Sequence, residues 1–62
     1  MRIEINGEPR EVAQTTLDQL ITVRPTSVAT AVNGIFVPVT LRSVTTLAEG
    51  DRIEILSPMQ GG

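Results

Sequence analysis

The tetrapeptide Arg-Ile-Glu-Ile occurs twice in this 62-residue chain, at residues 2–5 and again at residues 52–55. Polar and apolar side chains alternate in both copies, which is the period of a β-strand with one buried face. Neither copy contains proline, so both suit the centre of a sheet, where the backbone N–H groups donate to neighbouring strands. The residues around the two copies do not repeat, which indicates two similar strands and not a duplicated domain.

Two Asn-Gly dipeptides predict two hairpins. Asn6-Gly7 and Asn33-Gly34 both suit a type I′ turn, because asparagine and glycine tolerate the positive φ that this turn requires. Each dipeptide is flanked by segments with strand character. The predicted hairpins pair residues 2–5 with 8–12 and residues 28–33 with 35–37.

Prolines set the positions of the outer strands. Pro9 lies within one predicted strand and Pro38 directly follows another, and a proline cannot donate a hydrogen bond to a neighbouring strand. Both strands are therefore expected at sheet edges. Numbered along the chain, the five strands then take the order 2-1-5-3-4 in a mixed sheet.

A short helix is predicted between the hairpins. Thr16 followed by Gln19 matches a capping box, in which the two side chains satisfy free N–H groups of the first turn. Pro25 disfavours helical geometry at Arg24 and ends the helix. Its apolar residues fall at i, i+3 and i+4 on one helical stripe: Leu17, Leu20 and Ile21.

These elements predict an α+β fold of the β-grasp type, a single domain over residues 1–62 with the helix covering one face of the sheet. The isoleucines of both repeated strands should face the helix. Arginine and glutamate should alternate on the other face. Residues 49–51 predict a turn, whereas residues 40–46 fit either a loop or a turn of helix.

The composition argues against an enzyme. The chain has no His, Cys, Lys, Tyr or Trp, so the usual nucleophile and base pairs, the usual ligands of zinc and the lysine of a phosphate-binding loop are all missing. The net charge is −2, and the five arginines are scattered along a sequence with one aromatic residue. Nucleic-acid binding, which favours basic patches with stacking aromatics, is therefore not expected.

Other features of the chain predict a cytoplasmic protein. There is no cysteine for disulfides, and no apolar run approaches the roughly 20 residues that cross a bilayer. The first ten residues alternate apolar and charged side chains, unlike a signal peptide. We expect no membrane contact.

The last five residues, 58–62, are expected to form a flexible C-terminal tail. Pro58 should stop the last strand, and Met59, Gln60, Gly61 and Gly62 follow it. Five extended residues reach about 17 Å, enough to enter the cleft of a partner. Because glycine has no side chain, Gly62 would present its carboxylate without obstruction. This pattern indicates a carrier on which other enzymes act.

Four segments of the sequence resemble the ThiS family of thiamin-pathway sulfur carriers, which have the ubiquitin-like β-grasp fold and are related to MoaD. The segments are Ala-Val-Asn-Gly at 31–34, Phe-Val-Pro at 36–38, Glu-Gly-Asp-Arg-Ile-Glu-Ile at 49–55 and Ser-Pro-Met-Gln-Gly-Gly at 57–62. The resemblance covers nearly the whole chain, and the terminal hexapeptide is its strongest part.

The resemblance implies a cycle of reactions at Gly62. A ThiF-like adenylyltransferase would use ATP and Mg²⁺ to form an acyl-adenylate, with no cofactor bound by the carrier itself. A sulfur donor such as a cysteine desulfurase would convert it to a thiocarboxylate, and a ThiG-like thiazole synthase would take the sulfur. Such a carrier is expected to be a monomer when free and to form transient interfaces.

Three further residues are candidates for partner docking. Leu56 breaks the alternation set by Ile53 and Ile55, so it should lie on the outer face beside the tail. Pro58 adjoins it. Phe36, the one aromatic residue, belongs either to the core or to the docking surface.

Two other functions stay open at this point. A MoaD-like carrier for molybdopterin or cysteine synthesis would share the same tail chemistry with a different acceptor. The fold could also serve as a plain interaction module, for which the diglycine would be dispensable. As a ubiquitin-like protein modifier, it would instead be conjugated to other proteins through the diglycine.

Overall fold

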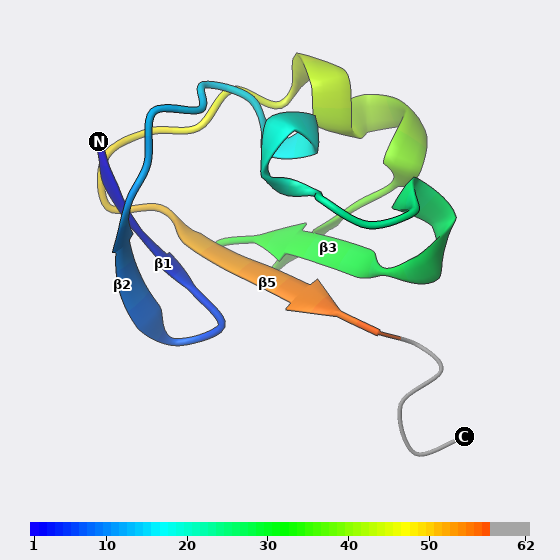
Figure 1. Cartoon of the computed structure of the whole chain (residues 1–62), viewed down its shortest axis with the longest axis horizontal. Helices are drawn as coiled ribbons and strands as arrows, with labels where there is room; N and C mark the ends of the chain where they lie inside the picture. Colours follow the sequence, from blue (N-terminus) through cyan, green and yellow to red (C-terminus); the bar gives the residue numbers. More distant parts are fainter. Residues whose placement is uncertain (58–62) are drawn as a thin grey trace.

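The computed structural model describes residues 1–57. Within this part of the chain, five strands form one mixed sheet in the predicted order, β2-β1-β5-β3-β4. Short 3-10 helices cover one face of it (Figure 1). The strands are β1 (Arg2–Ile5), β2 (Glu8–Glu11), β3 (Ala29–Val32), β4 (Ile35–Val37) and β5 (Arg52–Leu56), and the helices are η1 (Leu17–Leu20), η2 (Pro25–Ser27) and η3 (Val39–Val44).

Two antiparallel hairpins are joined by the last strand. β1 pairs with β2 and β3 pairs with β4, while β5 lies between the hairpins, parallel to β1 and antiparallel to β3. Asn6 and Asn33 both have φ of 52°, and the glycines after them have φ of 85° and 86°. Positive φ at both positions is the geometry of a type I′ turn, so the predicted turns are confirmed.

The prolines lie where the sequence predicts them. Pro9 lies in β2, at one edge of the sheet, and is paired with Glu4. Pro38 follows β4 at the opposite edge and precedes η3 as its N-cap residue. Residues 40–46, for which the sequence fits either a loop or a turn of helix, lie mostly within the 3-10 helix η3.

The predicted helix is shorter and tighter than expected. Its capping box is present at Thr16 and Gln19, but η1 is a 3-10 helix in which the N–H of Ile21 donates to the carbonyl of Asp18 at 3.1 Å. With three residues per turn, side chains at i and i+3 share a face and i+4 turns aside. Leu17 and Leu20 accordingly pack in the core cluster, whereas Ile21 lines a separate hollow.

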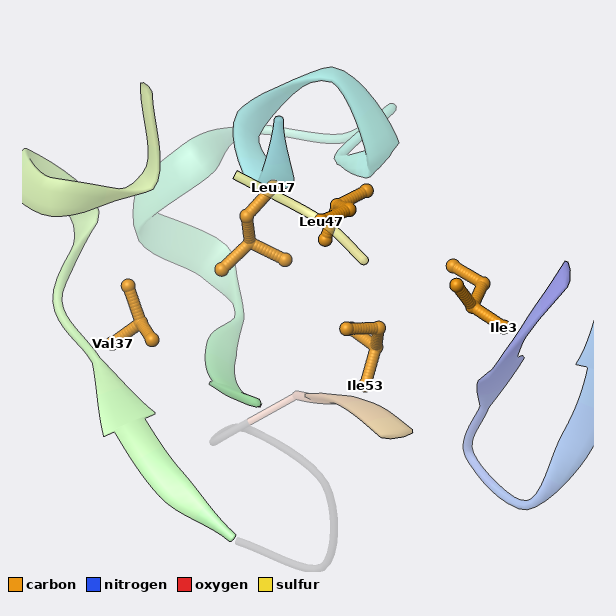
Figure 2. Close-up of a cluster of buried hydrophobic side chains, with 5 residues drawn as sticks. All are labelled: Ile3, Leu17, Val37, Leu47 and Ile53. Carbon is orange, nitrogen blue, oxygen red and sulfur yellow. The ribbon is translucent and has the colours of Figure 1, made fainter. Parts of the chain in front are cut away.

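The core is a small cluster between the sheet and the helical layer. Figure 2 shows side chains from β1, β4 and β5 pointing toward those of η1 and the segment after η3. Ile3 and Ile53, one from each repeated tetrapeptide, are both 1% exposed, and Leu17 is completely buried. Ile5 and Ile55 are half-buried and pack against the cluster. The prediction for the isoleucines is therefore confirmed. The cluster consists of Ile3, Leu17, Val37, Leu47 and Ile53.

The outer face of the two repeated strands is charged and exposed, as expected. Glu4 of β1 lies beside Arg52 of β5 in the parallel register. The four charged side chains of the repeats are Arg2, Glu4, Arg52 and Glu54, and all are exposed.

One arginine is buried, which the sequence analysis did not predict. Arg42 of η3 is 2% exposed, and its guanidinium donates three hydrogen bonds. Nε donates to Thr30 Oγ1 at 2.9 Å, Nη1 to the carbonyl of Pro25 at 2.8 Å and Nη2 to the carbonyl of Val28 at 2.7 Å. The planar fork of the guanidinium suits acceptors in several directions. Arg42 therefore ties η3 to η2 and to the start of β3.

Candidate functional site

The centre of the sheet leads directly to the predicted tail. β5 ends at Leu56, and the described chain ends one residue later at Ser57. The candidate residues Pro58, Met59, Gln60, Gly61 and Gly62 lie outside the described residues. The site that the structure does show is therefore the end of β5 and the surface beside it.

The end of β5 is paired on the side of β3. Ala29 lies opposite Leu56, and Ala31 lies opposite Glu54. Because directly opposite residues point to the same face of a sheet, and residues two apart along a strand do as well, all four share the outer face. The strand thus brings Leu56 to the surface immediately before the tail.

Leu56 and Phe36 are both exposed on this face. Leu56 is 58% exposed and Phe36 is 64% exposed, so the outward position predicted for Leu56 is confirmed. Phe36 lies opposite Ala31, on the outer face, and the alternative that it belongs to the core is wrong. The reason is that Val37, its neighbour in β4, points inward and takes the core position at 8% exposed.

These residues form a small apolar surface, which we call the outer apolar patch: Ala29, Ala31, Phe36 and Leu56. Ala29 and Ala31 lie on β3, between Leu56 of β5 and Phe36 of β4. Because alanine side chains are short, the surface is lower between the two large side chains. From the spacing of strands and the rise per residue, the Cα atoms of Phe36 and Leu56 lie roughly 12 Å apart. Charged residues continue the same face, which gives an apolar centre with a polar border, as in many transient interfaces.

Next to the patch, the outer face has a shallow hollow of about 350 Å³ between the two Asn-Gly turns. Its lining is mostly charged or backbone: Glu4, Gly7, Gly34, Arg52, Ile53 and Glu54. Other apolar side chains are exposed elsewhere, including Leu41 and Val44 of η3. Leu41 and Val44 belong to the helical layer and not to the outer face of the sheet.

Two side chains at the hairpin turns contact β5 in a way that the sequence analysis missed. Asn6 Oδ1 accepts from the N–H of Ile55 at 2.9 Å, and Asn33 Oδ1 accepts from the N–H of Arg52 at 2.9 Å. The Asn-Gly pattern predicts the turns. It contains no signal for these contacts, because they depend on a strand about 50 residues from Asn6 and 20 from Asn33.

The described residues offer little for catalysis or metal binding. No group of three or more His, Cys, Asp or Glu side chains in residues 1–57 could hold a metal ion. In the same residues, no helix is long and apolar enough to cross a membrane.

Comparison with known proteins gives a consistent result. A family model described as the ThiS family matches residues 3–62. The fold is similar to the crystal structure of the thiamine biosynthesis protein ThiS from Geobacter metallireducens, with a TM-score of 0.83 and 26% identity over 100% of both chains. An NMR structure of a thiamine biosynthesis protein from the same organism has a TM-score of 0.73 and 28% identity over 100% of this chain and 88% of that one. No curated protein matches this chain.

Proposed function

Since this chain belongs to the ThiS family, we propose that it carries sulfur as a C-terminal thiocarboxylate on Gly62 and donates it to a thiazole synthase in thiamin biosynthesis. Members of this family are small carriers and not enzymes, and the two similar solved structures are those of thiamine biosynthesis proteins. The family match extends to Gly62 itself. The observation that carries the proposal is that the central strand β5 leads straight into this terminus beside an exposed apolar patch.

The chemistry at Gly62 would begin with activation. A carboxylate oxygen attacks the α-phosphorus of ATP and releases pyrophosphate, which leaves a mixed anhydride with AMP. A sulfur nucleophile then attacks the carbonyl carbon, so that a C–S bond forms and AMP leaves. Hydrosulfide gives the thiocarboxylate directly, whereas a donor persulfide gives an acyl disulfide, whose S–S bond a thiol then cleaves to release the thiocarboxylate and form a new disulfide. A carboxylate is a poor electrophile until it carries such a leaving group, and a terminal glycine adds no side chain to obstruct the attack.

This chain supplies the carboxylate, and its partners supply the catalysts. A ThiF-like adenylyltransferase would bind ATP and Mg²⁺, a cysteine desulfurase or similar donor would provide the sulfur, and a ThiG-like thiazole synthase would accept it. Gly61, Gln60 and Met59 would thread the channel of each partner. The cytoplasmic location expected from the sequence stays a prediction.

The outer apolar patch is the proposed docking surface for these partners. Phe36 and Leu56 are large, exposed and on the face that ends at the tail, and Pro58 would extend this surface. A partner that covers the patch would therefore have the tail at the edge of its interface. A few side chains near the centre of an interface often contribute most of the binding energy.

Intact-mass spectrometry tests the proposed chemistry. The protein is incubated with ATP, Mg²⁺, a sulfur donor and the cognate adenylyltransferase, and the C-terminal peptide is then sequenced in the mass spectrometer. We expect replacement of one oxygen by sulfur at Gly62. The matched control is a variant that lacks only Gly62, in which the mass should stay unchanged.

Two results would contradict the proposal. If no thiocarboxylate forms although the same enzyme modifies its own established substrate, the carrier chemistry is wrong. If the thiocarboxylate forms but thiazole synthase cannot use it while the large subunit of molybdopterin synthase can, the chain is a MoaD-like carrier. Isopeptide conjugates on other proteins would instead indicate a modifier.

A further inference from the structure

The two Asn-Gly turns are alike in backbone and differ in which end of β5 their side chains hold. Asn6 contacts Ile55, near the tail, through both of its amide atoms: Oδ1 accepts from the N–H at 2.9 Å, and Nδ2 donates to the carbonyl at 3.1 Å. Asn33 contacts the start of the strand, where Oδ1 accepts from the N–H of Arg52 and Nδ2 donates to Asp51 Oδ1 at 3.0 Å. Asn33 can therefore serve as a matched control for Asn6.

The Asn6 side chain continues the pairing of β1 with β5 beyond the end of β1. The N–H of Glu4 donates to the carbonyl of Asp51 and the N–H of Asn6 donates to the carbonyl of Ile53, both at 2.9 Å. The next β5 residue that points its backbone groups to this side is Ile55. The backbone of β1 has already turned away at Asn6, so the carboxamide supplies the donor and the acceptor that a further strand residue would have supplied.

Both sides of β5 are therefore held almost to its last residue. β3 pairs with β5 as far as Leu56, and Asn6 holds Ile55 on the opposite side. Without the Asn6 carboxamide, the last residues of β5 would be hydrogen-bonded to β3 alone. The strand end could then swing away from β1, and with it the point from which residues 58–62 start.

We propose that Asn6 is a positioning residue for the reactive C-terminus: by holding Ile55, it fixes the direction in which the chain leaves the sheet relative to the outer apolar patch. The inference rests on the proposed carrier function. A partner docked on the patch then meets a strand end, Ile55 and Leu56, that is already held on both sides in the free carrier. That part of the ordering does not have to occur on binding.

Asparagine suits this position for two reasons at once. The turn needs positive φ, which glycine adopts freely and asparagine adopts more readily than other residues. Of these two residues, only asparagine also has a carboxamide, which here donates one hydrogen bond to the facing backbone and accepts one from it. Glycine at this position would preserve the turn and remove the contact, which makes Asn6→Gly the informative substitution.

The test compares Asn6→Gly with Asn33→Gly in the full-length protein. Three quantities are measured: the kcat and KM of adenylate formation by the cognate adenylyltransferase, the hydrogen-exchange rate of the Ile55 amide, and the urea midpoint of unfolding. We expect Asn6→Gly to lower kcat/KM about tenfold, mostly through KM, because the end of β5 must now be ordered on binding. Asn33→Gly should stay within about twofold of the parent at a similar loss of urea midpoint, since its amide contacts the far end of β5.

Asn6→Asp provides a second, milder variant. Its carboxylate still accepts from the Ile55 N–H but cannot donate to the Ile55 carbonyl. Its kcat/KM should fall between those of the parent and Asn6→Gly, with intermediate exchange of the Ile55 amide. This variant also decides the matter if Asn6→Gly fails to fold.

The outcomes separate the two proposals. Equal kcat/KM for Asn6→Gly and Asn33→Gly, with the parent fully active, would overturn the role of Asn6 and leave the carrier function in place. An unchanged Ile55 exchange rate in Asn6→Gly would also overturn it, because the contact would then hold nothing. A parent protein that is never adenylated would overturn both.

Discussion

The two faces of the sheet come from the same strands but serve different ends. On the inner face, Ile3 and Ile53 are 1% exposed and pack under Leu17. On the outer face, Leu56 and Phe36 are more than half exposed, although they are as apolar as the buried residues. Exposure alone does not mark a site, since Val44 is exposed as well; what marks Leu56 and Phe36 is that they share one face with Ala29 and Ala31 beside the end of β5.

Alternate residues of one strand point to opposite faces, so the inward residues stabilise the fold and the outward residues are free for the docking role proposed above. Within β5, Ile53 lies in the core and Leu56, three residues later, lies on the opposite face. In β4, Val37 is buried and its neighbour Phe36 is exposed. Substitutions on the inner face should therefore change the free energy of unfolding, and those on the outer face should change partner binding.

The largest effect is expected from Ile53→Ala. Truncation of a fully buried isoleucine costs about 2–5 kcal/mol in the free energy of unfolding, whereas a core in a domain this small seldom supplies more than about 3–5 kcal/mol. Most of the variant should be unfolded. Far-UV circular dichroism during urea denaturation measures this, since the chain has no Trp or Tyr for fluorescence.

Leu56→Ala is the matched control for that substitution, because it truncates a similar side chain on the other face of the same strand. Its urea midpoint should stay close to that of the parent. A loss of stability as large as that of Ile53→Ala would break the distinction between the faces.

The next largest effect is expected from Arg42→Ala, which acts on the inner face through Thr30. The substitution leaves Thr30 Oγ1 and the carbonyls of Pro25 and Val28 without their donor. We expect a loss of about 2–3 kcal/mol in the free energy of unfolding. Urea denaturation checks this against Arg24→Ala, an exposed arginine whose removal should change the same quantity by at most about 0.5 kcal/mol.

Arg42→Lys sharpens the result. A lysine ammonium is a compact charge and cannot reach three acceptors that lie along a planar fork. The variant should therefore recover only a minor part of the loss. Full recovery would mean that charge alone, and not the geometry of the guanidinium, is what the site needs.

A smaller effect is expected from Thr30→Val, which keeps the shape of a 2% exposed side chain and removes its hydroxyl. That hydroxyl donates to the carbonyl of Val37 at 2.8 Å and accepts from Arg42 Nε. Loss of both bonds should lower the free energy of unfolding by about 1–2 kcal/mol. The exposed Thr40→Val is the control in the same denaturation experiment, and an equal effect of the two would show that the buried network contributes nothing.

The smallest effect on stability, and the largest on binding, is expected from Leu56→Ser and Phe36→Ser. Both side chains are exposed, so the free energy of unfolding should change by at most about 0.5 kcal/mol. If the patch docks the adenylyltransferase as proposed, KM for the carrier should rise about tenfold, as when an interface anchor is truncated. Steady-state pyrophosphate release measures KM, with Val44→Ser on the helical layer as the exposed control.

An unchanged KM in both outer-face variants would exclude the patch from docking without touching the chemistry proposed at Gly62. A rise in KM for Val44→Ser equal to theirs would move the docking surface to the helical layer. Either result would revise the interpretation of the outer face.

Much of the fold could be predicted because its signals are local. Proline in or next to a strand, Asn-Gly at a turn and the alternation within Arg-Ile-Glu-Ile each depend on a few neighbouring residues. Together they gave the strand order. The helix was predicted less well, because Leu17, Leu20 and Ile21 fit an α-helical stripe while the short segment before Pro25 adopts the tighter 3-10 form.

The features that could not be predicted depend on residues far apart in the sequence. Arg42 resembles the exposed arginines until η2, η3 and β3 surround it. Likewise, the contact of Asn6 with Ile55 spans 49 positions. Phe36 was left open between core and surface because the sequence does not show that Val37 occupies the inward position. The roles of residues 58–62 rest on the family resemblance and the proposed chemistry.

The central place of β5 also bears on how this molecule responds to force. A pull on the residues beyond Ser57 is transmitted along β5, whose ladders to β1 and β3 run on both flanks. Any load on that end therefore enters the sheet through a strand that is hydrogen-bonded on both sides, and not through an edge strand bonded on one.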